Sequence, residues 1–154
     1  MLPPFAAYEL PYPKSCHVYL NGTQSIPPNV NTVVVVNAVL WDTYGFYTGG
    51  STNYINVPED GLYFVASGLH SMTVITAPLG VAVWRNGVRD FGIVYSANTT
   101  NTMQVFVSYI NMFDKNDKLE FVAYSRASTN IDIGSGAFDC FLQVLKLPYI
   151  TKGF

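Results

Sequence analysis

The sequence is short of charge. Only 12% of its 154 residues are Asp, Glu, Lys or Arg, which is about half the share found in an average soluble protein. Apolar residues make up 49% of the chain and aromatic residues 15%. A free monomer of this size normally shows more charge to water. Either polar uncharged side chains or partner subunits should therefore cover much of the surface.

Other absences exclude whole classes of protein. The eight Lys and Arg residues are scattered from Lys14 to Lys152, and the net charge is −2, so no basic cluster is available to neutralise several phosphates. No apolar run approaches the roughly 20 residues of a transmembrane helix. The start of the chain has neither the basic region nor the long apolar run of a signal peptide. We expect no nucleic-acid or membrane partner, and, if the chain is complete from Met1, a protein that is made in a cytoplasm and is not exported by a signal peptide.

Catalytic motifs are missing as well. His17 and His70 are isolated in the sequence, and on a strand the side chains of Cys16 and His17 point to opposite faces. The two cysteines, Cys16 and Cys140, are too few for a disulfide scaffold or a four-ligand zinc site. We expect two buried free thiols, with a bridge between the first and last strands as the alternative. The sequence predicts no enzyme and no cofactor.

Acidic residues gather only where turns are expected. Asp is favoured in turns because its side chain accepts hydrogen bonds from the nearby backbone. A calcium site built on Asp114, Asn116 and Asp117 would supply three of the roughly six to eight oxygens that the ion needs. Asp132 is either a ligand or, more simply, another turn residue. The turn interpretation is favoured, and no metal site is expected.

The first 15 residues differ from the rest of the chain. They hold four of the nine prolines, which disfavour both helix and central strand, so an extended arm is expected. Free tails are usually charged and polar, whereas this one is apolar. The arm should therefore lie on a neighbouring chain or another protein, with its own domain and disorder as alternatives. Its candidate binding residues are Leu2, Phe5, Tyr8, Leu10 and Tyr12.

Residues 16–148 are predicted to form one β domain, followed by a short tail at 149–154. The clearest pattern is a hairpin over 80–95, because Asn86-Gly87 favours a two-residue type I′ turn. No segment shows the apolar spacing of a helix. Many short strands separated by turns predict an all-β, antiparallel two-sheet sandwich or jelly roll. The expected strands are 16–21, 32–41, 52–57, 62–71, the two halves of 80–95, 103–113, 118–125 and 137–147.

The segment 62–71 is unusual for a strand. A strand with one wet face alternates apolar and polar residues, but Leu62-Tyr63-Phe64-Val65-Ala66 is apolar in both registers. Something other than water should therefore cover its second face.

Four blocks, in this order, resemble the tumour-necrosis-factor-like jelly-roll superfamily, which includes the globular heads of complement-type collagenous proteins. Together they cover about residues 16 to 147. Asn116 and Cys140 stand where that superfamily favours glycine. The blocks are VNAVLWDTYGFY (36–47) with NYINVPEDGLYFVASGL (53–69), VAVWRNGV (81–88), FDKNDKLEF (113–121) and SGAFDCFLQVLKL (135–147).

The resemblance implies a homotrimer in which one sheet is covered by two other subunits around a threefold axis. Tyr63 and Val65 would then face the interior of the sandwich. Burial of an aromatic side chain contributes roughly 2–3 kcal/mol, so several such residues in each subunit would make the trimer obligate. A monomeric sandwich core is the alternative. The residues expected at the axis are Leu62, Phe64, Ala66, Phe106 and Phe138.

Small proteins of this fold also occur in tailed bacteriophages, as capsid decoration proteins and as receptor-binding tips. A short chain with an apolar arm is similar to the former. We therefore expect a trimeric cementing protein on the exterior of a virion capsid, with arms that bind the major capsid protein and neighbouring trimers. The alternative is a receptor- or glycan-binding head that uses loops 72–79 and 96–102.

Overall fold

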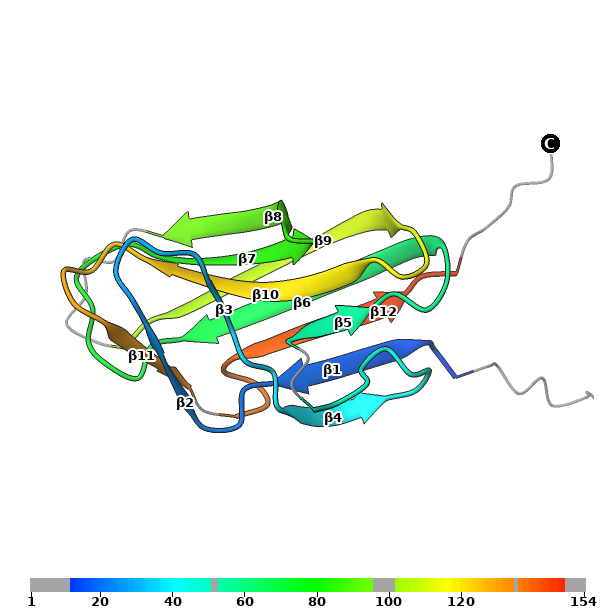
Figure 1. Cartoon of the computed structure of the whole chain (residues 1–154), viewed down its shortest axis with the longest axis horizontal. Coiled ribbons are helices and arrows are strands. Elements are labelled where there is room, and N and C mark those ends of the chain that lie inside the picture. The colour runs from blue at the N-terminus through cyan, green and yellow to red at the C-terminus, as the bar shows by residue number, and fades with distance from the viewer. Residues whose placement is uncertain (1–11, 51–52, 96–101, 135, 149–154) are drawn as a thin grey trace, which may run out of the picture.

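The computed structural model describes residues 12–50, 53–95, 102–134 and 136–148, and within these ranges it contains strands and no helix. Nor does this part of the chain hold any helix that could cross a bilayer. The expected all-β class is confirmed (Figure 1). The strands are β1 (Ser15–Tyr19), β2 (Thr23–Ile26), β3 (Thr32–Val33), β4 (Ala38–Asp42), β5 (Tyr54–Asn56), β6 (Gly61–His70), β7 (Leu79–Arg85), β8 (Val88–Tyr95), β9 (Gln104–Phe113), β10 (Lys118–Ser125), β11 (Ile131–Gly134) and β12 (Phe141–Lys146).

The strands form two antiparallel sheets packed face to face. The first sheet has the order β4-β1-β12-β6-β9, and the second has the order β3-β10-β7-β8, with β5 also pairing to β10. A small ladder of β11 and β2 stands beside them. Strands far apart in sequence, such as β1 and β12, are neighbours. This non-consecutive order is typical of a jelly roll.

The core lies between the sheets and is made by alternate residues of the long strands. Along β6, Tyr63, Val65 and Leu69 are fully buried. They meet Phe121 of β10 and Val83 of β7, which are fully buried in the second sheet. Because successive strand residues point to opposite faces, the inward positions fix the register of each strand.

The predicted hairpin is present. Asn86 and Gly87 join β7 to β8 with φ values of 54° and 79°, the left-handed pair that a type I′ turn requires. Asn116 has a φ of 73°. Asn is the residue after Gly that best tolerates this conformation, which explains how it can stand where the resemblance leads us to expect a glycine.

Three expectations for the strands are wrong. Segment 32–41 is not one strand, because β3 joins the second sheet and β4 joins the first. Strand β12 begins at Phe141, so residues 137–140 form a turn before it. Asp132 is not in a turn: it lies in β11 and pairs with Ser25 of β2, and neither of these strands was expected.

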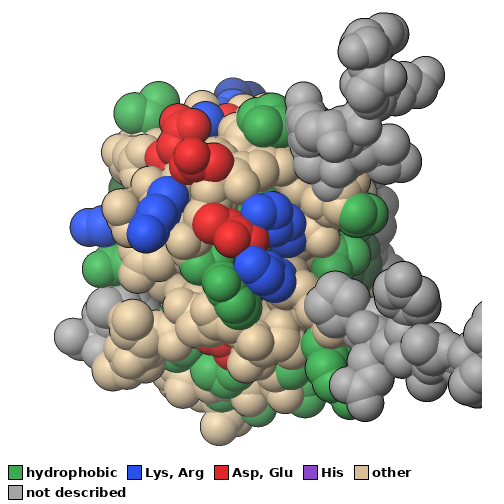
Figure 2. All heavy atoms as spheres, turned by 90° about the vertical axis from the view of Figure 1, so that its right-hand side faces the viewer, with side chains coloured by type: hydrophobic (Ala, Val, Ile, Leu, Met, Phe, Trp, Pro, Cys, Tyr) green, Lys and Arg blue, Asp and Glu red, His purple; other side chains and the backbone are tan. Residues whose placement is uncertain are grey.

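The molecule has two different ends. Strand β1 begins and β12 ends at the same end of the sandwich, on the right in Figure 1, while the β6–β7 and β10–β11 loops lie at the other. At the first end, the Nζ atoms of Lys14 and Lys146 each lie 2.6 Å from Oε1 of Glu59. Figure 2 shows acidic and basic side chains gathered there. This charge cluster fixes the point at which the chain enters the first sheet.

Candidate subunit interface

Strand β6 carries two apolar rows. Tyr63 and Val65 point into the sandwich and are fully buried, as expected. Leu62, Phe64 and Ala66 point the other way and are half-buried. The expected directions of these side chains are therefore confirmed, and a position of the outward row at a threefold axis stays a prediction. These three residues lie on the outward side of the first sheet.

Neighbouring strands extend this outward row into a surface. In the register, Phe64 lies between Leu145 of β12 and Ile110 of β9. Gly68 lies between Phe141 and Phe106 in the same way. We call this surface the apolar face. It comprises Trp41, Leu62, Phe64, Ala66, Gly68, Phe106, Ile110, Met112, Phe141 and Leu145.

Several members of the apolar face are exposed to an extent that is unusual for large hydrophobic side chains. The exposed fractions are 47% for Phe106, 57% for Ile110 and 49% for Met112. Soluble monomers rarely leave a contiguous surface of this kind in water. The exposure therefore identifies the apolar face as the candidate functional site.

Glycine at position 68 lets two rings lie flat on the sheet. A Cβ atom at Gly68 would stand 2.5 Å from Cε1 of Phe141 and 2.8 Å from Cε1 of Phe106. The two ring centroids are 6.2 Å apart. The phenyl rings thus occupy the space above the glycine, as aromatic side chains do when they cover glycine in a strand.

His17 lies at the edge of the apolar face. Its ring centroid is 4.8 Å from that of Trp41 and stacks at 5.0 Å on that of Phe141. Nε2 lies 2.6 Å from the carbonyl oxygen of Ala137 and donates to it. Burial lowers the pKa of His17, against the opposing effects of the Ala137 carbonyl and the Gln143 side chain. The imidazole is therefore held neutral within an aromatic stack.

Phe138 was expected at the threefold axis with the other aromatics. It lies in the turn before β12 and is 72% exposed, with its ring centroid 6.1 Å from that of His17. It therefore stands at the margin of the apolar face and not on a strand. Its contribution to an interface stays a prediction.

The sequence interpretation missed six of the ten residues of the apolar face, namely Trp41, Gly68, Ile110, Met112, Phe141 and Leu145. Ile110 and Met112 alternate with buried residues of β9, so the same two-residue period that picked out β6 could have found them. Trp41 and Leu145 carry no comparable signal, because their facing depends on the pairing of β1 with β4 and with β12.

The acidic turn is occupied by the protein's own cation. Nη2 of Arg85 lies 2.9 Å from Oδ2 of Asp114 and 2.6 Å from Oδ2 of Asp117. Asn86 donates to Oδ1 of Asp117 at 2.7 Å. Burial alone would raise the pKa of Asp117, but hydrogen bonds from the Asp114 backbone, Arg85 and Asn86 hold it below its usual value. These carboxylates brace a turn, in agreement with the turn interpretation.

The cysteines are free and buried. Burial raises the pKa of the Cys140 thiol to about 11 and raises that of Cys16 as well. Both thiols are therefore protonated near neutral pH and are poor nucleophiles. Among the described residues no three His, Cys, Asp or Glu side chains are grouped as they would be around a metal ion.

The expected arm falls mostly outside the described residues, which exclude Leu2, Phe5, Tyr8 and Leu10. Tyr12 is described and is 89% exposed. Of the two candidate loops, 72–79 is described and leads into β7, whereas 96–101 lies outside the described residues.

No family model matches the chain, and no curated protein matches it by sequence. Solved structures do match. Eiger TNF from S. frugiperda superposes with a TM-score of 0.67 at 14% identity, covering 92% of this chain and 99% of that one. Murine APRIL at pH 5.0 gives 0.68 at 16% identity, with coverages of 88% and 99%.

The globular domain of zebrafish complement 1qA protein matches with a TM-score of 0.64 at 12% identity, covering 88% of this chain and 98% of that one. Identities this low carry the architecture and no more. The strand order, the two packed sheets and these superpositions together show that the chain has the tumour-necrosis-factor-like jelly-roll fold.

Proposed function

We propose that the chain is the subunit of a non-enzymatic homotrimer that assembles through the apolar face. One observation carries the proposal. The first sheet is apolar on both sides, and its outward side leaves Phe106, Ile110 and Met112 about half exposed in the single chain. Two further copies around a threefold axis would cover this side in each subunit.

The energetics favour a stable assembly. Burial of one aromatic or large aliphatic side chain contributes roughly 1.5–3 kcal/mol, and each subunit offers several. The loss of translational and rotational freedom costs roughly 4–15 kcal/mol for each association. The face is also free of buried charge at its centre, since Phe64 is flanked by Leu145 and Ile110.

Mass in solution tests this proposal. Three chains of 17.0 kDa should sediment together as one species of about three times that mass, at protein concentrations down to the nanomolar range expected for obligate assembly. A well-folded species of a single chain's mass would overturn the proposal.

We further propose that the trimer decorates the exterior of a viral capsid and cements it, made in the host cytoplasm and carried on the virion. The arm, residues 1–15, would bind the major capsid protein and neighbouring trimers. The charge cluster of Lys14, Glu59 and Lys146 supports this role, because it ties the base of the arm to the sandwich. Three arms would bind together more tightly than one.

Deletion of residues 1–14 tests the arm. The truncated protein should still be a trimer but should no longer bind capsids of the virus that carries the gene. Undiminished capsid binding would contradict a role for the arm. A truncated protein that becomes monomeric would show instead that the arm contributes to assembly.

A receptor-binding head is a second candidate. A hollow of about 380 Å³ lies between loop residues 73–77 and residues 127–131, at the end of the sandwich away from Lys14 (Figure 1). Thr73, Thr76 and Thr129 line it and offer hydroxyl groups for hydrogen bonds. Binding of the truncated trimer to host cells, abolished by Thr73→Val with Thr129→Val, would favour this role over capsid decoration.

A further inference from the structure

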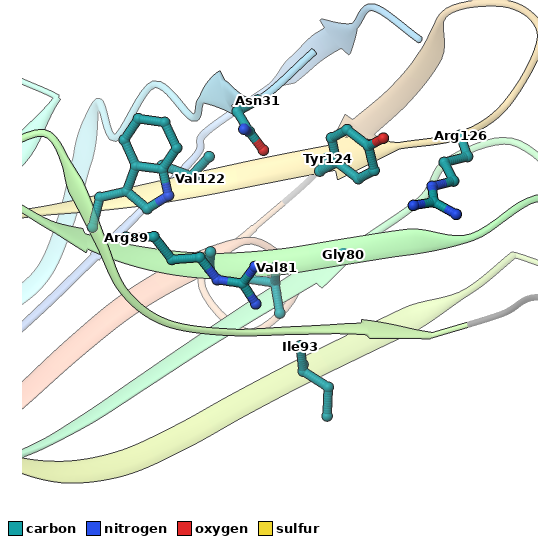
Figure 3. A pocket seen from close by; sticks show the side chains of 10 residues that line it. Asn31, Gly80, Val81, Arg89, Ile93, Val122, Tyr124 and Arg126 are labelled. Atoms are coloured by element: carbon teal, nitrogen blue, oxygen red, sulfur yellow. The ribbon is translucent and has the colours of Figure 1, made fainter. Parts of the chain in front are cut away.

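The outward side of the second sheet carries a groove of about 370 Å³ that the proposed trimer does not use. Strands β7, β8 and β10 supply most of its lining, and Asn31 before β3 closes one side. Figure 3 shows Arg89 and Arg126 at its two ends, with Tyr124 between them. The apolar face is on the opposite sheet, so this groove would stay open to solvent in the trimer.

Small residues form the floor of the groove. Ala82 lies between Val122 of β10 and Gly92 of β8, and Gly80 lies beside Tyr124. A Cβ atom at Gly92 would stand 2.6 Å from Cβ of Ala82, so the two strands leave no room for larger side chains there. The low floor is therefore built into the packing of β7 against β8.

Two aromatic side chains stand above this floor. Trp84 and Tyr124 are both outward-facing and half-buried. The outward residues of β7 are Gly80, Ala82 and Trp84, and Tyr124 of β10 pairs with Gly80, so the two rings stand at opposite ends of this row. Their ring faces can pack against an apolar surface while their polar atoms stay in contact with water. A flat ligand with an apolar side and polar edges would fit between them.

The groove also holds two arginine side chains, Arg89 and Arg126. The sequence contains three arginines, and Arg85 is paired with Asp114 and Asp117. Within the described residues neither Arg89 nor Arg126 forms an ion pair. Arg89 donates from Nη2 to the Gly92 carbonyl at 2.9 Å, and its remaining N–H groups are free to bind a ligand.

The described residues that line the groove include no carboxylate. Glu120 pairs with Trp84 in the register of β10 and β7, but it is not among the lining residues. Two guanidinium groups, neither of them in an ion pair with a described residue, thus face one hollow on a protein whose net charge is −2. A guanidinium binds a carboxylate through two parallel hydrogen bonds, which gives it both strength and direction.

We propose that this groove binds an acidic saccharide, a sugar that carries a carboxylate such as a sialic or uronic acid. Arg126 or Arg89 holds the carboxylate, the sugar ring lies on the floor between Trp84 and Tyr124, and the Asn31 amide bonds a hydroxyl group. A nucleic acid would need more cations than two to neutralise its phosphates. The inference does not depend on the trimer, since every lining residue comes from one subunit.

Calorimetric titration with matched sugars tests this site. The probes are 3′-sialyllactose against lactose, and tetragalacturonate against its carboxyl-reduced form. We expect one acidic sugar to bind and its neutral partner to bind at least about tenfold more weakly, because a charge-assisted hydrogen bond is worth roughly 1.5–3 kcal/mol. Which acidic probe binds distinguishes a sialic acid from a uronic acid.

Arginine variants connect the binding to the groove. Arg126→Gln and Arg89→Gln in combination should lower the affinity for the acidic sugar by about tenfold or more. Arg126→Lys should keep part of this affinity because it retains the charge. Both arginines are exposed, so the variants should unfold at the temperature of the parent protein. Lys115→Gln, which removes one exposed cation from the β9–β10 turn, is the matched control and should leave binding unchanged.

Four results would overturn the proposal. They are no binding of either acidic sugar, equal binding of the neutral partners, unchanged binding in the arginine variants, and equal or better binding of a glutamate-rich peptide. Because calorimetry reports the affinity of each subunit, the result is the same whether the protein sediments as one chain or as three.

Discussion

The two sheets have the same kind of inner side and very different outer sides. The outward row of β6 and β9 presents Phe64, Phe106 and Ile110, whereas the outward row of β10 presents Lys118, Glu120 and Tyr124. Both rows obey the same two-residue alternation. The inward positions therefore determine the fold, and the outward positions determine what covers each sheet.

The comparison also separates two kinds of surface. The apolar face is broad, contiguous and without charge at its centre, which suits another protein surface. The groove on the second sheet is small, bounded by aromatic rings and holds two guanidinium groups, which suits a small polar ligand. Four substitution or titration experiments can break or sharpen this difference.

The largest effect is expected at the centre of the apolar face. Phe64→Glu should convert the trimer into monomers, because each of three copies would place an unpaired carboxylate in a desolvated interface at a cost of several kcal/mol. Sedimentation velocity measures the change. Val88→Glu, on the second sheet where Val88 is 70% exposed, is the matched control and should leave the trimer intact. A Phe64→Glu protein that still sediments as a trimer would refute the assignment of the interface.

The next largest effect concerns the inner side. Leu142 of β12 is fully buried, so Leu142→Ala should lower the free energy of unfolding by about 2–5 kcal/mol. Its neighbour Gln143 points outward, and Gln143→Ala should lower this free energy by only about 1 kcal/mol or less, because this half-buried side chain fills no space between the two sheets and only its hydrogen bond to His17 is lost. Denaturant unfolding at one fixed protein concentration measures both. Equal losses in the two variants would mean that Leu142 does not point inward between the two sheets.

Two glycines give a smaller and more selective test. Gly92→Ala would place a Cβ atom 3.0 Å from the backbone Cα of Ala82, and it should lower the free energy of unfolding by about 1–3 kcal/mol. At Gly68 the obstructing atoms are the ring edges of Phe106 and Phe141, which can swing outward in a free subunit. Gly68→Ala should therefore weaken assembly more than it weakens folding. The opposite ranking in unfolding and sedimentation experiments would argue that the apolar face is not an interface.

The smallest effect is a pH dependence. Burial holds the pKa of His17 below its ordinary value, so the unfolded chain binds a proton at a higher pH than the folded chain does. Stability from this group is complete above about pH 6.5 and is lost as the pH falls, with a slope of at most about 1.4 kcal/mol per pH unit. Unfolding between pH 5.5 and 7.5 should show a shallower slope for His17→Gln than for the parent protein. Identical slopes would mean that His17 is not held neutral.

Much of the fold could be predicted because local patterns determine it. The two apolar rows of β6 and the Asn86-Gly87 turn are short-range signals, and both are present in the structure. The resemblance extended these signals into the jelly roll and its two sheets. The alternation placed Leu62 and Phe64 on the face opposite Tyr63 and Val65, and the resemblance implied which of these two faces points outward.

The errors arose where pairing partners decide the outcome. The run TVVVVNAVLW (32–41) is apolar apart from Thr32 and Asn37, yet β3 pairs with β10 and β4 pairs with β1, so the chain crosses from one sheet to the other. Asn37 stands directly before β4, but a single polar residue does not by itself mark that crossing. Strand β11 was missed because the pairing of Ile131 and Ile133 with β2 is visible only in three dimensions.

The acidic turn shows the same limit on a smaller scale. The sequence places Asp114 and Asp117 close together, but Arg85 lies 29 positions before Asp114. Only the fold brings this guanidinium to the two carboxylates. A cluster of acidic residues in a sequence therefore says little about metal binding until the positions of the protein's own basic side chains are known.

The chain enters and leaves the sandwich side by side, since the Lys146 amide donates to the Lys14 carbonyl at 2.8 Å. Because these two points of the chain are adjacent, a circular permutant that joins them should fold. A few glycines joining residue 13 to residue 148, with new ends cut between Asn86 and Gly87, would keep every strand pairing of both sheets. Such a re-threaded protein would carry its free ends on the second sheet and could display a fused peptide there.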